Sequence, residues 1–97
     1  MPELTTIELE MGLTEKEFDR VLPNATKPYD VHTTPTGFAL VNDQHRVTID
    51  KTPLSPRVIA SARLPRMLVV ITFKHHDEAE VKAFMVRFNR YMHRGGG

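Results

Sequence analysis

Residues 66–74 constrain the fold of this chain more than any other segment. They alternate with the period of a β-strand, and apolar side chains occupy both faces of that strand: Met67, Val69, Ile71 and Phe73 on one, Leu68 and Val70 on the other. A strand that is apolar on both faces usually lies inside a sheet, where both faces are covered. We therefore expect the chain to build a sheet around this segment.

The C-terminal segment predicts an amphipathic helix that can cover one face of the sheet. Asp77 and Glu80 have the three-residue spacing of a capping box, which opens a helix. The residues that follow form one apolar stripe at helical spacing, made of Val81, Phe84, Met85, Phe88 and Met92. Gly95 is a stop signal. We expect this helix to supply much of the core.

The N-terminal segment predicts a strand and then a short helix. Residues 5–11 alternate between apolar and polar side chains, as in a half-buried strand. Thr14 and Glu17 have the form of a capping box, so a helix should begin there. Pro23 is expected to end that helix near Leu22, because proline disfavours a helical residue before it.

The middle of the chain predicts a loop and then further strands. Residues 24–37 indicate a long loop with room for one short strand over residues 29–33. Three more strand-like patterns precede the central segment, over residues 38–41, 47–49 and 57–64, the last ended by Pro65. The expected class is α+β, with an antiparallel sheet of four to five strands, the order β-α-β-β-β-β-α, and the C-terminal amphipathic helix packed on one sheet face.

Length and composition limit the kind of protein this can be. The chain has 97 residues, which suits a single domain, expected over residues 1–94 with a disordered glycine tail over 95–97. It has no cysteine, which excludes thiolate chemistry and suits a reducing compartment. The N-terminus lacks a basic segment typical of signal peptides, and the longest apolar run, residues 67–71, is too short to cross a bilayer. We predict a cytoplasmic protein with no membrane contact.

Charge is distributed unevenly along the chain. Residues 1–50 hold four Lys or Arg against nine acidic residues, and residues 51–97 hold nine against three. Five arginines of the C-terminal half are candidate anion-binding residues: Arg57, Arg63, Arg87, Arg90 and Arg94. Arg57 and Arg63 should share one face of the strand over residues 57–64. Their strand lacks interleaved aromatic residues for base stacking, so nucleic acid is a possible but not a favoured partner.

The sequence contains no pattern that identifies an enzyme, a cofactor site or a metal site. His75, His76 and Asp77 are adjacent, but neighbouring side chains point apart, and a zinc site would need another histidine nearby. Ser61 lacks the glycine elbow of hydrolases, and there is no glycine-rich phosphate loop. We therefore predict no catalytic residues, no metal and no cofactor. A weaker alternative is an enzyme that uses residues 29–34 as an active-site loop.

Three apolar residues on the outer side of the predicted sheet give the remaining lead, namely Ile59, Leu68 and Val70. They could be covered by the first helix, form a contact between two copies of the chain, or line a groove for a partner. The first of these is the favoured interpretation. The functional hypothesis is a small non-enzymatic accessory or protein-binding module, with an unidentified protein or a second copy as its partner. The alternative is a binder of an anionic ligand, such as nucleic acid, through the basic residues.

Overall fold

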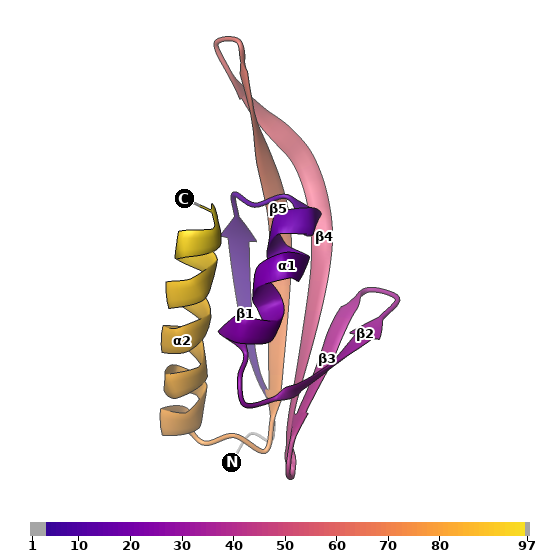
Figure 1. Ribbon diagram of the computed structural model, residues 1–97, viewed down its shortest axis with the longest axis vertical. Helices are drawn as coiled ribbons and strands as arrows, with labels where there is room; N and C mark the ends of the chain where they lie inside the picture. The colour runs from indigo at the N-terminus through magenta and orange to yellow at the C-terminus, as the bar shows by residue number, and fades with distance from the viewer. Residues whose placement is uncertain (1–3, 97) are drawn as a thin grey trace.

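A computed structural model describes residues 4–96 of the chain. Its elements follow the order β1 (Leu4–Met11), α1 (Glu15–Ala25), β2 (Asp30–Thr34), β3 (Gly37–Asn42), β4 (His45–Ile59), β5 (Ala62–Lys74) and α2 (Glu78–Gly96). This order and the α+β class confirm the prediction. Figure 1 shows that β4 and β5 form a hairpin much longer than any other part of the sheet.

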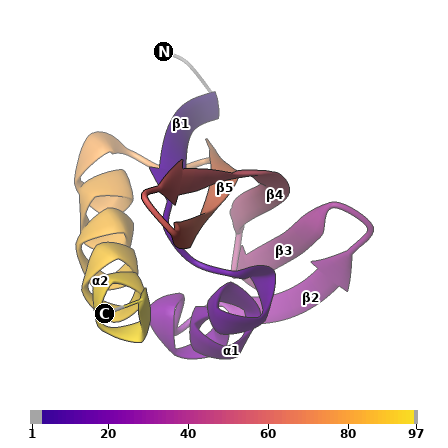
Figure 2. The same cartoon turned by 90° about the horizontal axis from the view of Figure 1, so that it is seen from above.

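All five strands form one antiparallel sheet in the order β1-β5-β4-β3-β2. The strand predicted to lie inside the sheet is part of β5, which pairs with β1 on one side and β4 on the other. Figure 2 shows the sheet as a curved layer with both helices on one side of it. One sheet face is therefore covered by helices, and the other has no helix over it.

The core lies between the covered face and the two helices. Phe18 of α1 and Phe88 of α2 are fully buried, with ring centroids 6.2 Å apart. The sheet contributes its inward side chains: Phe38, Leu40, Val47, Ile49, Met67, Val69, Ile71 and Phe73. The apolar stripe predicted for the C-terminal helix is confirmed, because Phe84, Phe88 and Met92 belong to this core.

Both predicted capping boxes are present. The Glu17 amide donates to Thr14 Oγ1 at 3.2 Å, and the Thr14 amide donates to Glu17 Oε1 at 3.0 Å. At the start of α2 the Glu80 amide donates to Asp77 Oδ1, and the Asp77 amide donates to Glu80 Oε1, both at 2.8 Å. The first turn of each helix is thus stabilised by side chains within four residues of sequence.

Helix α1 extends past the proline that was expected to end it. Pro23 lies inside the helix, which continues to Ala25. Ala25 and Thr26 are buried, and the Thr26 amide and hydroxyl both donate to the Leu22 carbonyl, at 3.1 Å and 2.9 Å. Burial and these two hydrogen bonds keep the last turn helical despite the donor that proline lacks.

The strand predicted over residues 57–64 is wrong, because a turn divides it. Residues 57–59 end β4, residues 62–64 begin β5, and Ala60 and Ser61 form the turn between them. Pro65, expected to end a strand, lies inside β5, opposite a register shift between Leu54 and Arg57. A proline is tolerated where the ladder is interrupted, because no hydrogen bond is lost there.

The short strand expected over residues 29–33 is β2, which pairs with β3, so the connections on either side of it are shorter than the long loop that was predicted. Gly37 begins β3 at a point where β4 approaches closely. A Cβ atom at position 37 would stand 1.9 Å from the Ile49 carbonyl oxygen. Only glycine, which has no Cβ atom, fits at this close approach of the two strands.

The C-terminal glycines do not end helix α2 as predicted. Helix α2 runs through Gly95 and Gly96, where the sequence predicted a disordered tail, and position 97 lies outside the described residues. Glycine weakens a helix but does not forbid one. Across residues 4–96, neither helix is long and apolar enough to span a membrane.

Candidate functional site

The outer end of the β4–β5 hairpin projects beyond the other strands, as Figure 1 shows at the top of the view. We call residues 55–64 the arm. β1 pairs with β5 only as far as Met67, and β3 pairs with β4 only as far as Asp50, so both sides of the arm lack a neighbouring strand. Every residue of the arm is exposed. The arm is thus a two-stranded ribbon without a core.

Large apolar side chains on the arm face solvent. Val58 is 61% exposed, Ile59 54% and Leu64 44%, and together they make up most of the large exposed apolar residues in the described chain. Isolated two-stranded hairpins are at best marginally stable in water. Ile59 and Leu64 lie on one face of the arm and Val58 on the other, so the ribbon exposes apolar side chains on both of its faces.

The arm separates two arginines that the sequence placed on one face. Arg57 pairs with Leu64, whereas Arg63 pairs with Val58 one position further along. Successive residues of a strand point to opposite faces, so Arg57 and Arg63 lie on opposite faces of the arm. The expectation that they share a face is wrong because the turn at Ala60 places them on different strands.

The base of the arm is held to the sheet by Arg66. Its guanidinium donates to Glu10 Oε1 on β1, with Nη2 at 2.5 Å and Nε at 3.2 Å, and its Nη1 donates to the Ser55 carbonyl at 3.3 Å. The Arg66 hydrogen bonds hold the pKa of Glu10 below its ordinary value. Arg57 Nη2 lies 3.9 Å from Glu10 Oε2. The sequence analysis did not single out Arg66. Because Arg66 and Leu68 are two residues apart on β5, they share the helix-free face of the sheet, and Leu68 pairs with Glu10 on that face.

No helix covers Leu68 and Val70. They pair with Glu10 and Glu8 on the helix-free face of the sheet and are only partly buried. Ile59 lies at the tip of the arm, also away from both helices. The favoured interpretation, that the first helix covers these three residues, is wrong because α1 packs on the opposite face of the sheet.

The helical arginines do not join those of the arm. Arg87 is partly buried near the end of α1, where its Nε donates to the Asn24 carbonyl at 3.0 Å. Arg90 is exposed on the outer surface of α2. The side chain of Arg94 lies outside the described residues. The four predicted anion-binding arginines whose side chains the structure describes therefore do not form one surface.

A second group of polar side chains lies near the start of α2. His76 Nδ1 is 2.9 Å from the Lys74 carbonyl oxygen, so this nitrogen carries the proton of the neutral ring. His76 Nε2 then accepts a hydrogen bond from the Tyr29 hydroxyl at 2.7 Å. His45 Nε2 contacts Glu80 Oε2 at 2.7 Å, and the rings of His45 and His76 are 4.7 Å apart.

The electrostatics of this group do not activate a nucleophile or hold a metal. Burial raises the pKa of the Tyr29 hydroxyl, and the Glu80 carboxylate raises it further, so the phenolate is disfavoured. Burial lowers the pKa of His76, against the effect of its bond to the Lys74 carbonyl. Within the described residues no three His, Asp or Glu side chains gather as a metal site.

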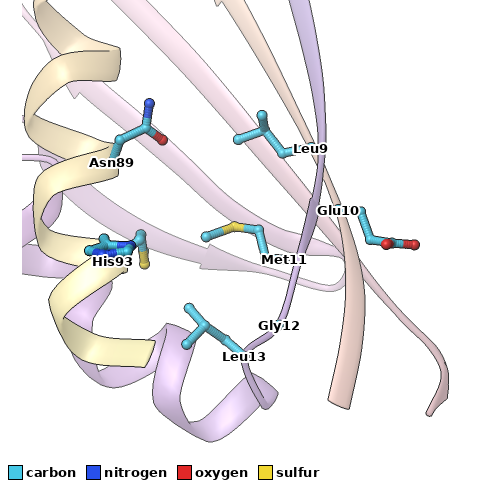
Figure 3. Close-up of a pocket in the computed structure, with 8 residues that line it drawn as sticks. Leu9, Glu10, Met11, Gly12, Leu13, Asn89 and His93 are labelled. Atoms are coloured by element: carbon cyan, nitrogen blue, oxygen red, sulfur yellow. The ribbon is translucent and has the colours of Figure 1, made fainter. Parts of the chain in front are cut away.

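A hollow of about 460 Å³ lies between the end of β1 and the last turns of α2. Figure 3 shows Leu9, Met11 and Leu13 extending toward Asn89 and His93, whereas Glu10 extends to the other side of β1. Its walls are mainly apolar and the carboxylate turns away. Asn89 and His93 are its remaining polar side chains, so the hollow offers few polar groups to fix a ligand.

Sequence reasoning brought together neither Tyr29 with His76 nor His45 with Glu80, because these pairs are distant in sequence and no local pattern links them.

Comparison of the chain with protein-family models, with curated proteins and with solved structures gave no match.

Proposed function

We propose that the protein is a small non-enzymatic binding module, and that its arm docks on a partner protein with an acidic surface. The observation that carries this proposal is the exposure of Val58, Ile59 and Leu64 on a hairpin without a core. Covering these side chains would remove apolar surface from water, at about 25 cal/mol per Å² of area buried. A partner would also restrict a hairpin that is marginal alone.

The charge of the arm indicates the chemistry of the partner. No acidic residue occurs between Asp50 and Asp77, and the arm carries Arg57 and Arg63 beside its apolar residues. Two arms of this kind would repel each other if they paired side by side. A partner with acidic residues around an apolar centre complements the arm in both respects.

The backbone of the arm supports the same partner class. Both strands of the arm extend beyond β1 and β3, so each has a free edge of N–H and C=O groups. Such an edge can pair with an extended segment of another protein, in which backbone bonds give affinity and side chains give specificity. The absence of cysteine supports the cytoplasmic location that we propose for this module.

Nucleic acid is a less suitable partner for the arm. A two-stranded ribbon fits the major groove of DNA, and the stretch without acidic residues is compatible with phosphates. Yet the arm offers only Arg57 and Arg63, and Arg57 already lies near Glu10. The arm has no aromatic side chain for stacking on bases.

The experiment uses a photo-crosslinking residue at Ile59 in the full chain, with the same residue at Asp43 as the control. Asp43 lies in the β3–β4 turn, at the other end of the sheet. A partner that crosslinks at 59 and not at 43 is then purified and its affinity is measured. We expect Ile59→Ser to weaken binding about tenfold, whereas Val86→Ser on α2 leaves it unchanged.

Three outcomes would overturn the proposal. One is equal crosslinking at both positions. Another is a purified partner whose affinity does not change with Ile59→Ser. The third is binding to a generic DNA duplex, detected by light scattering. If the affinity for the duplex falls steeply as the salt concentration rises, and binding is lost in the Arg57→Glu, Arg63→Glu double variant, the partner is a polyanion.

A further inference from the structure

A small pocket lies beside the Tyr29 and His45 group, on the opposite side of the molecule from the helix-free sheet face. Its volume is about 230 Å³, below the range of about 300–1,000 Å³ typical of sites for drug-sized ligands. The end of α1 and the loop after it, the last residue of β3, the first residue of β4, and α2 all contribute to its walls. The residues that matter for the argument are Lys27, Tyr29, His45, Glu80, Phe84 and Arg87.

Arg87 carries a charge that the described protein leaves without a carboxylate. The side chain is partly buried, and its donors contact the Asn24 carbonyl at 3.0 Å and the Tyr91 hydroxyl at 3.3 Å, both uncharged. Its guanidinium lies 4.6 Å from the centre of the Tyr91 ring. None of the ion pairs of the described residues includes Arg87. A partly buried cation without an anion favours an anion beside it.

The other charges around the pocket do not cancel this preference. Lys27 adds a second cation at the same pocket and also forms no ion pair within the described chain. Glu80 is the acidic residue of the pocket, and its Oε2 is engaged by His45 at 2.7 Å. The two cations therefore outnumber the one carboxylate, which already has a partner.

The remaining wall is aromatic. The rings of Tyr29 and Phe84 meet edge to face with centroids 5.5 Å apart. The hydrogen bond of Tyr29 to His76 keeps its hydroxyl oriented toward the imidazole. A cationic side and an aromatic side in a pocket of this size suit a small molecule with one oxyanion and one short apolar group.

The geometry points to a binding site for a small organic oxyanion, a carboxylate or a phosphate monoester on a compact apolar group, with Arg87 and Lys27 as its anion-binding residues. This site is separate from the arm and does not depend on the proposed partner. Its failure or success therefore leaves the arm proposal untouched.

The test is an NMR titration of the full chain with benzoate and with phenyl phosphate at constant ionic strength. The two probes share a ring and differ in the oxyanion, so they distinguish a carboxylate site from a phosphate site. We expect a saturable shift of the amides of His45 and Ala83 with at least one probe. Inorganic phosphate, which lacks the ring, should bind more weakly than that probe.

Matched variants assign the site. Lys27→Gln should weaken binding by at least about threefold, and Arg87→Gln by about tenfold or more. Lys16→Gln and Arg90→Gln change exposed cations outside the pocket and should leave the affinity unchanged. The inference is overturned if neither probe saturates by about 10 mM, or if Lys27→Gln binds as well as the unmodified chain does. Because Lys27 is exposed, its variant tests the site even if Arg87→Gln fails to fold.

Discussion

At residue 60 an alanine holds a backbone conformation that side chains disfavour. Ala60 has φ 54°, in the left-handed region, at the first position of the arm's turn. This conformation costs an L-residue about 1–2 kcal/mol, and glycine avoids the cost. We expect Ala60→Gly to slow amide hydrogen exchange in the arm by about two- to fivefold, after allowance for the extra entropy of glycine when unfolded. Ala62→Gly, in a strand with ordinary φ, should instead speed exchange. Equal effects of the two variants would show that the turn carries no strain.

His76 makes stability depend on pH. Its folded pKa lies below the unfolded value, because burial is the largest cause and His45 adds to it, while the Lys74 carbonyl, Glu80 and Asp77 oppose them. As pH falls from about 6.5, the unfolded chain takes up a proton that the folded chain resists, so stability is lost until the pH passes below the folded pKa. At pH values above about 6.5, His76 is neutral in both states and no longer lowers the stability of the folded protein.

The measurement is urea denaturation at pH 7 and at pH 5. His76→Gln should reduce the loss of stability between these two values, because a glutamine does not titrate. His32→Gln, at an exposed site on β2, serves as the control for the effect of the same substitution elsewhere on the protein. An unchanged pH dependence in His76→Gln would contradict the assignment.

Among the elements, α2 should contribute to the free energy of unfolding through its buried face and not through its exposed face. Phe88 is fully buried against Phe18 and Phe84, so Phe88→Ala should cost about 3–5 kcal/mol of unfolding free energy. Val86 lies on the same helix and is 50% exposed, and Val86→Ala should cost less than about 0.5 kcal/mol. Chemical denaturation measures both. Similar losses for the two variants would mean that the stripe of α2 is not the core face.

The elements also show which signals the sequence carried. Both helix starts were predictable because a capping box lies within four residues, and the stripe of α2 because helical spacing is local. The end of α1 was not, since the burial of Ala25 outweighs the local effect of Pro23. The arm was missed because Ala60 is not a typical turn residue and Ser61 alone is a weak turn signal, so the alternation across them resembled one continuous strand.

For the whole molecule, the arm and the body should behave as separable parts. No residue of 55–65 belongs to the core, so replacing these residues, which lie between the paired Leu54 and Arg66, by a two-residue Asn-Gly turn should leave the fold intact. We expect the circular dichroism spectrum to keep its helical signal and the melting temperature to change by no more than about 5 °C. The shortened chain should lose binding to the crosslinked partner. Loss of the folded state would show that the arm supports the core.

The candidate sites were less predictable than the fold because they depend on how distant segments meet. Arg87 was chosen from the sequence only as one of five arginines of the C-terminal half. Its significance comes from Asn24 and Lys27, which only the packing of α1 against α2 brings near. Arg57 and Arg63 were chosen as a pair, and the register of β4 with β5 separates them.

The continuity of β4 and β5 gives the molecule the mechanics of a cantilever. Both strands run without a joint from the core into the arm, apart from the register shift between Leu54 and Arg57. At the root of the arm, Arg66 of β5 donates hydrogen bonds to Glu10 of β1 and to the Ser55 carbonyl of β4, and these bonds hold the root to the sheet. A load applied at Ile59 would therefore bend the arm at the register shift, while these bonds keep its root fixed. We therefore expect a molecule bound at the tip to move relative to the body mainly through bending at this register shift.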